Sequence, residues 1–140
     1  MNRTGAPDST SKRKFKINKK SINHITLAVF APLLILVGVA GFLVPAQHSL
    51  TSGAPAYNLF HLFFGSAGLI VLWSRKELLA GLFNTGFGLI DLYQALASYM
   101  HLPPEQYFHW TRLDDILHIL IGLALVIIGS YGIAKRGQPR

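Results

Sequence analysis

The sequence predicts an all-α, polytopic membrane protein: an antiparallel bundle of four transmembrane helices that forms a duplicated helical hairpin. The 140-residue chain is 51% hydrophobic and only 14% charged, which is more apolar than an ordinary soluble domain. Its charged residues gather at the ends and in short gaps, so that four long apolar runs remain. We predict transmembrane helices at about 25–44, 57–73, 78–100 and 113–134, in one domain at 24–135.

A basic tail precedes this domain. Seven of the thirteen Lys and Arg residues lie in the first twenty positions. The segment 1–23 is too polar to bury a core, so we predict a disordered cytoplasmic tail there and a short second tail at 136–140. The basic run at 12–20 is expected to bind anionic lipids of the bilayer. Because the basic residues flank apolar runs instead of forming a patch on a folded domain, we do not expect nucleic acid as a partner.

The first apolar run, 25–44, is long enough to cross a hydrocarbon core of about 30 Å. A cleaved signal peptide is the alternative, because basic residues precede the run. The apolar core of a signal peptide is usually about 7–15 residues, however, so a retained helix is the favoured interpretation. Pro32 lies near the start of this helix, and Gly38 and Gly41 would allow another helix to approach closely.

The second and fourth runs begin with the same pattern, a polar residue, a histidine three positions later and a glycine four beyond it. The two copies are Asn58, His61 and Gly65, and Asp115, His118 and Gly122. Since steps of three and four share a helix face, each copy forms one stripe. The copies lie 57 residues apart, which predicts two parallel copies of one hairpin. Chance similarity between two helices that run in the same direction is the alternative.

The third run is the most polar of the four. Its polar residues follow one another at steps of seven, three and four, and so share one side of a helix: Asn84, Asp91, Gln94 and Ser98. A carboxylate inside the bilayer is expensive unless it is paired or neutral, so we expect Asp91 to have a partner, with a histidine as the nearest candidate. Eight glycines are predicted to pack helices together: Gly38, Gly41, Gly65, Gly68, Gly81, Gly88, Gly122 and Gly129.

The distribution of basic residues predicts the topology. The turn at 75–76 and the end at 135–140 carry Lys and Arg, whereas the loops 45–56 and 101–111 carry none. The positive-inside rule then places both termini in the cytoplasm. Both motif histidines would lie about 5–9 Å deep in the outer leaflet.

The predicted intramembrane polar cluster is Asn58, His61, Asp91, Gln94, Asp115 and His118. Its simplest role is interhelical hydrogen bonding, at about 0.6–2 kcal/mol for each bond. One alternative is a haem- or chlorophyll-type pigment ligated by His61, His118 or both. The other is a proton or ion relay, or a pH sensor, through His61, Asp91 and His118.

Catalysis and metal binding are not predicted. The histidine spacings match no compact set of metal ligands, the chain has no cysteine, and no nucleophile elbow or phosphate loop is present. We therefore expect no cofactor and a non-enzymatic structural or accessory protein. Its expected setting is a larger membrane complex or a homo-oligomer. The homo-oligomer is considered because the glycine faces outnumber what one four-helix core needs.

The two motifs also carry a family resemblance. They read Asn58-x-x-His61-Leu62-x-x-Gly65-x-x-Gly68-Leu69 and Asp-x-x-Leu117-His118-x-x-x-Gly122. In this the chain resembles a bacterial family of small four-helix membrane proteins, catalogued only as a domain of unknown function and found in actinobacteria, cyanobacteria and related groups. The resemblance covers about residues 27–134, and Pro32 departs from it in a stretch where the family is expected to be Gly-rich. It implies the fold and the topology but no activity.

Overall fold

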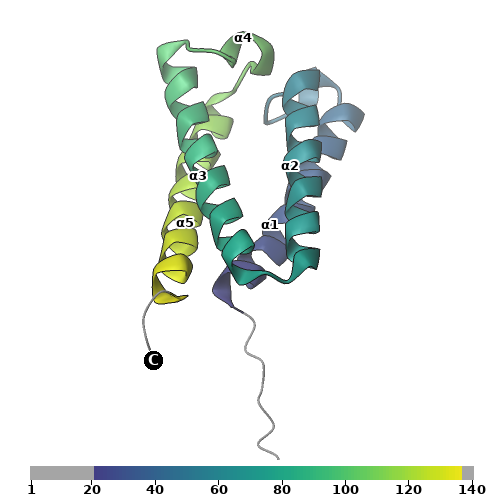
Figure 1. The fold of residues 1–140 in the computed structure, drawn as a ribbon. Coiled ribbons are helices and arrows are strands. Elements are labelled where there is room, and N and C mark those ends of the chain that lie inside the picture. The colour runs from purple at the N-terminus through teal and green to yellow at the C-terminus, as the bar shows by residue number, and fades with distance from the viewer. Residues whose placement is uncertain (1–20, 137–140) are drawn as a thin grey trace, which may run out of the picture.

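The computed structural model describes residues 21–136, and this part of the chain is all-helical, which confirms the predicted class (Figure 1). Its four long helices are α1 (Ile22–Leu43), α2 (Pro55–Ser74), α3 (Glu77–Met100) and α5 (Arg112–Arg136). A 3₁₀ turn, η1 (Ala46–His48), and the one-turn α4 (Glu105–Phe108) lie in the connections. The predicted tails at 1–23 and 136–140 fall almost entirely outside the described residues.

α1 begins three residues before its predicted start at 25. Ser21 is its N-cap, and the Ser21 hydroxyl accepts a hydrogen bond from the backbone N–H of His24 at 3.3 Å. Such a cap satisfies one of the free N–H groups of the first helical turn. Pro32 is accommodated inside α1, which continues to Leu43.

Three of these helices, α1, α2 and α5, are long and apolar enough to cross a membrane, which indicates a membrane protein. α3 is long enough, at 24 residues, but does not belong to this group, since Asn84, Asp91 and Gln94 interrupt its apolar sequence. Many large apolar side chains face outward on the long helices, among them Val29, Phe63, Leu89, Leu120 and Ile127. Lipid would cover these side chains.

The helices form two hairpins, α1 with α2 and α3 with α5, and each pair packs closely along its length. The two hairpins lie nearest to each other at the end that holds Ser21, the 75–76 turn and Arg136, and they diverge toward the end that holds η1 and α4 (Figure 1). We call these the terminal end and the loop end.

Both hairpins are closed by a glycine in the same position. In the first hairpin, a side chain at Gly65 would contact Ala31 and Ile35. In the second hairpin, a side chain at Gly122 would contact Gly88 and Leu92. An added Cβ would lie 3.0 Å from the Ala31 carbonyl at Gly65 and 2.8 Å from the Gly88 carbonyl at Gly122. Each residue of the second set lies 57 positions after its counterpart in the first. The two hairpins therefore use equivalent close contacts.

A buried amide pair joins the hairpins at the terminal end. Asn84 Nδ2 donates to the backbone carbonyl of Asn23 at 3.2 Å and to Asn23 Oδ1 at 3.1 Å. Gly132 of α5 lies directly against the Asn23 amide group, and a Cβ at Gly81 would lie 3.1 Å from it. Both asparagines are almost fully buried, so the start of α1 is held against α3 and α5.

Candidate functional site

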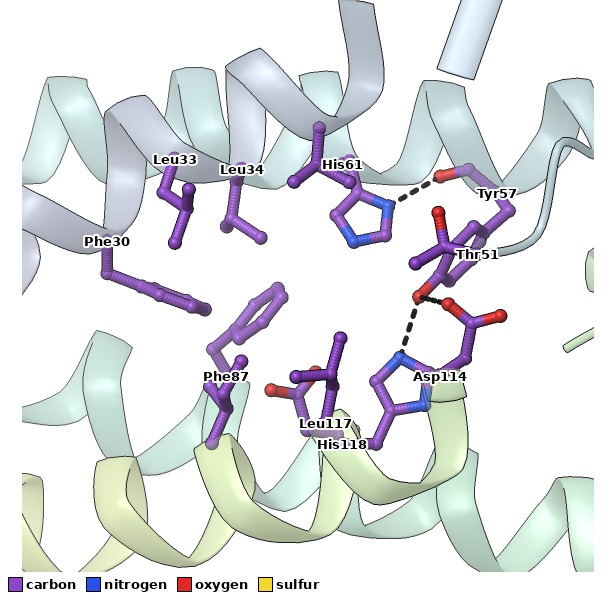
Figure 2. A pocket seen from close by; sticks show the side chains of 13 residues that line it. Phe30, Leu33, Leu34, Thr51, Tyr57, His61, Phe87, Asp114, Leu117 and His118 are labelled. Atoms are coloured by element: carbon purple, nitrogen blue, oxygen red, sulfur yellow. Dashed lines mark hydrogen bonds between the residues drawn. The ribbon is translucent and has the colours of Figure 1, made fainter. Parts of the chain in front are cut away.

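A cavity of about 80 Å³ lies between the two hairpins (Figure 2). The side chains that line it come from all four long helices and from the first loop. The polar ones are Thr51, Tyr57, His61, Asp91, Asp114 and His118. Phe30, Leu34 and Phe87 form much of the apolar wall, and in Figure 2 the aromatic rings of Phe30 and Phe87 lie at the side opposite Tyr57 and Asp114. The cavity therefore has a polar end and an apolar end.

Asp114 holds the polar end together. Its Oδ2 accepts hydrogen bonds from the backbone N–H of Ser52, the backbone N–H of Thr111 and the Thr111 hydroxyl, each at 2.8 Å. Its Oδ1 accepts a bond from the Tyr57 hydroxyl at 3.1 Å. One carboxyl group thus ties the first loop and α2 to the beginning of α5.

The local sequence explains why Asp114 is placed there. The Thr111 hydroxyl accepts a hydrogen bond from the Asp114 backbone N–H at 3.3 Å, while the Asp114 side chain accepts from the Thr111 backbone N–H. This reciprocal arrangement is a capping box, with Asp114 three residues after the capping threonine. The box points the carboxyl group back over the N-terminus of α5, where the backbone N–H groups and the helix dipole favour negative charge.

Ser52 extends the connection between the two loops. Its hydroxyl donates to the backbone carbonyl of Phe108, at the end of α4, and its backbone N–H donates to Asp114. Ser52 is buried although it lies in a connecting loop. The 44–54 and 101–111 connections are therefore fastened to each other across the gap between the hairpins.

The Tyr57 hydroxyl has one proton and contacts both Asp114 Oδ1 and His118 Nε2. It donates that proton to Asp114 Oδ1. His118 Nε2 lies 2.9 Å from the same hydroxyl oxygen and must then donate to it. This arrangement fixes the His118 tautomer with its proton on Nε2, and leaves Nδ1, which is buried without a partner among the described residues, as an acceptor.

His61 has the opposite tautomer. Its Nδ1 lies 2.9 Å from the backbone carbonyl of Tyr57, one helical turn earlier, and a carbonyl can only accept, so Nδ1 carries the proton. Nε2 is then an acceptor, and Figure 2 shows this nitrogen turned toward the cavity. The ring is held against the Tyr57 ring at a centroid distance of 4.3 Å.

Asp91 lines the same cavity from α3 and is only 4% exposed. Within residues 21–136, its carboxyl group takes part in no side-chain hydrogen bond and no ion pair. This differs from the partner that we expected for it. The physical reason is that each motif histidine already donates its one ring N–H to Tyr57. His61 donates to the Tyr57 backbone carbonyl, and His118 donates to the Tyr57 hydroxyl.

The structure brings three members of the predicted cluster together and separates the other three. His61, Asp91 and His118 line the cavity, whereas Asn58, Gln94 and Asp115 do not. Asn58 is buried on a face of α2 that does not line the cavity. Its amide group lies against Gly41, and Nδ2 donates to the Gly53 carbonyl at 3.5 Å. Gln94 is buried, with both side-chain polar atoms unpartnered among the described residues, and Asp115 is half-buried.

Tyr57 and Asp114 are the residues that the predicted cluster lacks. The motif alignment paired Asn58 with Asp115, but successive helical positions differ by about 100°, and the face one residue earlier is the one that meets the other hairpin. Two signals in the sequence identify that face. Thr111-x-x-Asp114 matches a capping box, and Tyr57 and Asp114 are themselves 57 positions apart.

At about 80 Å³, the cavity is far smaller than the roughly 300–1,000 Å³ of sites for larger ligands. In addition, His118 Nε2 is engaged by Tyr57 and is not directed at an open ligand position. Across residues 21–136, no group of three or more His, Asp or Glu side chains is arranged to hold a metal ion.

Comparisons with known proteins returned no match. No family model, no curated protein and no solved structure matches this chain. The family resemblance therefore stays a prediction that depends on the two histidine motifs, and the contacts described above are the basis for inferring a function.

Proposed function

We propose that this chain is a non-enzymatic protein of the bacterial inner membrane with a structural or accessory role, working as a subunit of a larger membrane complex. The observation that carries the proposal is the bonding of Asp114. Its four accepted hydrogen bonds join a loop, α2 and the start of α5, so its carboxyl group is used as a joint. A carboxylate held in this way is poorly suited to act as a catalytic base, and the cavity beside it is too small for a large substrate.

The proposed topology has four transmembrane helices, with α3 as the fourth. The polar side chains of α3 are buried against the other helices, and its outward face is apolar. The buried set is Asn84, Asp91 and Gln94, and the exposed set is Leu82, Leu89 and Leu96. A helix of this kind can cross a bilayer because its polar groups never meet lipid. The positive-inside rule supports a cytoplasmic location for the terminal end, which carries Arg75, Lys76 and Lys135.

The equivalent glycine contacts support an internal duplication. Gly65 and Gly122 close their hairpins against residues that are also 57 positions apart. Tyr57 and Asp114, at equivalent positions, meet between the hairpins. Such contacts are expected of two parallel repeats related by an axis along the membrane normal.

A larger complex is favoured over a homo-oligomer. A surplus of glycine faces would favour a homo-oligomer, but all eight glycines of that set lie against neighbours within this chain. Gly86 is the exception among the helical glycines described, since a Cβ added there would have no other atom within 4 Å. One small residue is a weak basis for a helix interface. Binding of anionic lipids by the basic run at 12–20 is part of the proposal, and this run lies outside the described residues.

The experiment is to tag the chromosomal copy and compare its native mass, after gentle extraction from its own membrane, with that of the purified 15.4 kDa chain. A native mass several-fold larger supports the accessory role. Two differently tagged copies, expressed together, then distinguish the assemblies: co-purification of the tags identifies a homo-oligomer, and its absence identifies other subunits. A monomeric mass in the native membrane contradicts the proposal.

A proton or ion relay is the second candidate function, and Asp91 is the observation that favours it. An unpaired carboxyl group and the free Nε2 of His61 share one cavity, as a relay requires. Proteoliposomes test it: Asp91→Asn and His61→Ala should each reduce proton uptake if the relay exists. The pigment alternative is disfavoured by the cavity volume, and visible absorbance of protein purified from a haem- and pigment-producing host would revive it.

A further inference from the structure

We propose that the cavity between the hairpins is a binding site for a small ammonium-type cation, either ammonium itself or a short primary alkylammonium. The proposal goes beyond the structural role and does not depend on the partner of the chain. It starts from a mismatch between the hydrogen-bond donors and acceptors that the cavity offers.

The Asp91 and His61 acceptors of the cavity are free, whereas the donors of Tyr57 and His118 are engaged. Asp91 supplies two carboxyl oxygens that form no hydrogen bond or ion pair among the described residues, and His61 supplies Nε2. The Tyr57 proton is directed to Asp114, and the Nε2 proton of His118 is directed to Tyr57. Thr51 adds one hydroxyl, which can donate or accept. A ligand with several donors and a positive charge complements this lining, whereas an anion would meet carboxylates.

Size and wall chemistry restrict the ligand further. A volume of about 80 Å³ exceeds the roughly 10–15 Å³ that one water needs but is far below the roughly 300–1,000 Å³ of larger ligand sites, so the ligand has few heavy atoms. Phe30 and Phe87 form the apolar end, with ring centroids 5.3 Å apart, at the side opposite Tyr57. Aromatic rings attract cations through their faces and also accommodate a short alkyl group. Metal ions are a poor match, since within residues 21–136 no set of three ligating side chains converges.

Leu33 of α1 and Leu117 of α5 both line the cavity and are both exposed on the outside of the bundle. A bound cation would also offset the cost of burying the Asp91 carboxyl group, which is only 4% exposed. Water filling the same space would relieve that cost without any preference among cations, and the experiment separates the two.

The test uses the purified full-length chain in lipid nanodiscs and measures Tm during titration with ammonium chloride, methylammonium chloride or potassium chloride at constant ionic strength. Potassium carries the same charge as ammonium and is nearly the same size, but it has no N–H groups to donate. We expect Tm to rise by at least about 2 °C and to saturate with ammonium and methylammonium, and to stay constant with potassium. An equal response to potassium, or no response to any of the three, overturns the proposal.

Two variants locate the site. Asp91→Asn should abolish the rise in Tm, measured from the variant's own baseline. Asp115→Asn removes the same charge from a half-buried position outside the cavity and should keep the rise. Loss of the response in both variants overturns the assignment. Calorimetric titration of the unaltered protein with methylammonium provides a readout that needs no variant, and an absence of saturable heat contradicts the proposal.

Discussion

Tyr57 and Asp114 are joined by a hydrogen bond of 3.1 Å, and they occupy the same position in the two hairpins, 57 residues apart. Residues at corresponding positions of the two hairpins can touch only where the hairpins face each other. His61 and His118, which also correspond, line the same cavity one turn further along their helices. Both copies of the sequence motif therefore contribute to one interface, and the bonds at that interface can be tested one at a time.

Tyr57→Phe removes the hydroxyl that connects Asp114 with His118. We expect it to lower the free energy of unfolding by about 1–2 kcal/mol, because two hydrogen bonds are lost and their buried partners are left unsatisfied. Reversible unfolding in mixed micelles measures the change. Tyr99→Phe is the matched control, since Tyr99 is 86% exposed, and it should change the stability by less than about 0.5 kcal/mol. Equal effects of the two substitutions would show that the Tyr57 hydroxyl holds nothing together.

Asp114→Asn should destabilise the loop end selectively. An amide group can accept on one side only, so its NH₂ would face either the Tyr57 hydroxyl or the donors of Ser52 and Thr111. We expect a loss of about 1–3 kcal/mol and faster hydrogen exchange at the backbone N–H groups of Ser52 and Thr111. Asp115→Asn is the control and should leave these two amides protected. If hydrogen exchange at these two amides stays unchanged in Asp114→Asn, the Asp114 carboxyl group does not hold the loop end together.

Glycine-to-alanine substitutions test the equivalence of the hairpins. A Cβ at Gly65 or Gly122 would collide with the facing helix, so each alanine should destabilise the protein by about 1–3 kcal/mol. Gly86→Ala meets no atom within 4 Å and should be neutral or stabilising, by up to about 1 kcal/mol, because alanine favours a helix. The measurement is unfolding in the same micelles. A large loss at Gly65 with none at Gly122 would contradict equivalent packing.

The topology can be determined with single cysteines, because the chain has none of its own. Lys76→Cys at the terminal end and His101→Cys at the loop end both lie at exposed positions. In intact cells, a membrane-impermeant maleimide should label position 101 and not position 76, and both should react after lysis. Labelling of position 76 alone would reverse the proposed orientation. Labelling of both in intact cells would contradict a membrane-spanning α3, because the two positions flank that helix.

The sequence by itself determined the helical class and the approximate position of every long helix. Apolar runs of about 20 residues are legible without tertiary information, because the length that a bilayer requires is a property of one segment. The stripe rule also selected His61, Asp91 and His118, since polar residues of a membrane helix must face inward to avoid lipid. These conclusions need only the period of a helix.

Only the tertiary structure decided which inward-facing groups meet. Asn58 and Asp115 share the motif but point about 100° away from the facing hairpin, whereas Tyr57 and Asp114, one position earlier, form the joint. The motif pattern covers about a third of the helix surface, so it cannot distinguish between two faces that differ by one residue position. The structure also leaves Asp91 without a hydrogen-bond partner, because both histidines already donate their ring N–H groups to Tyr57. Partner choice depends on where two hairpins cross, and no single helix contains that information.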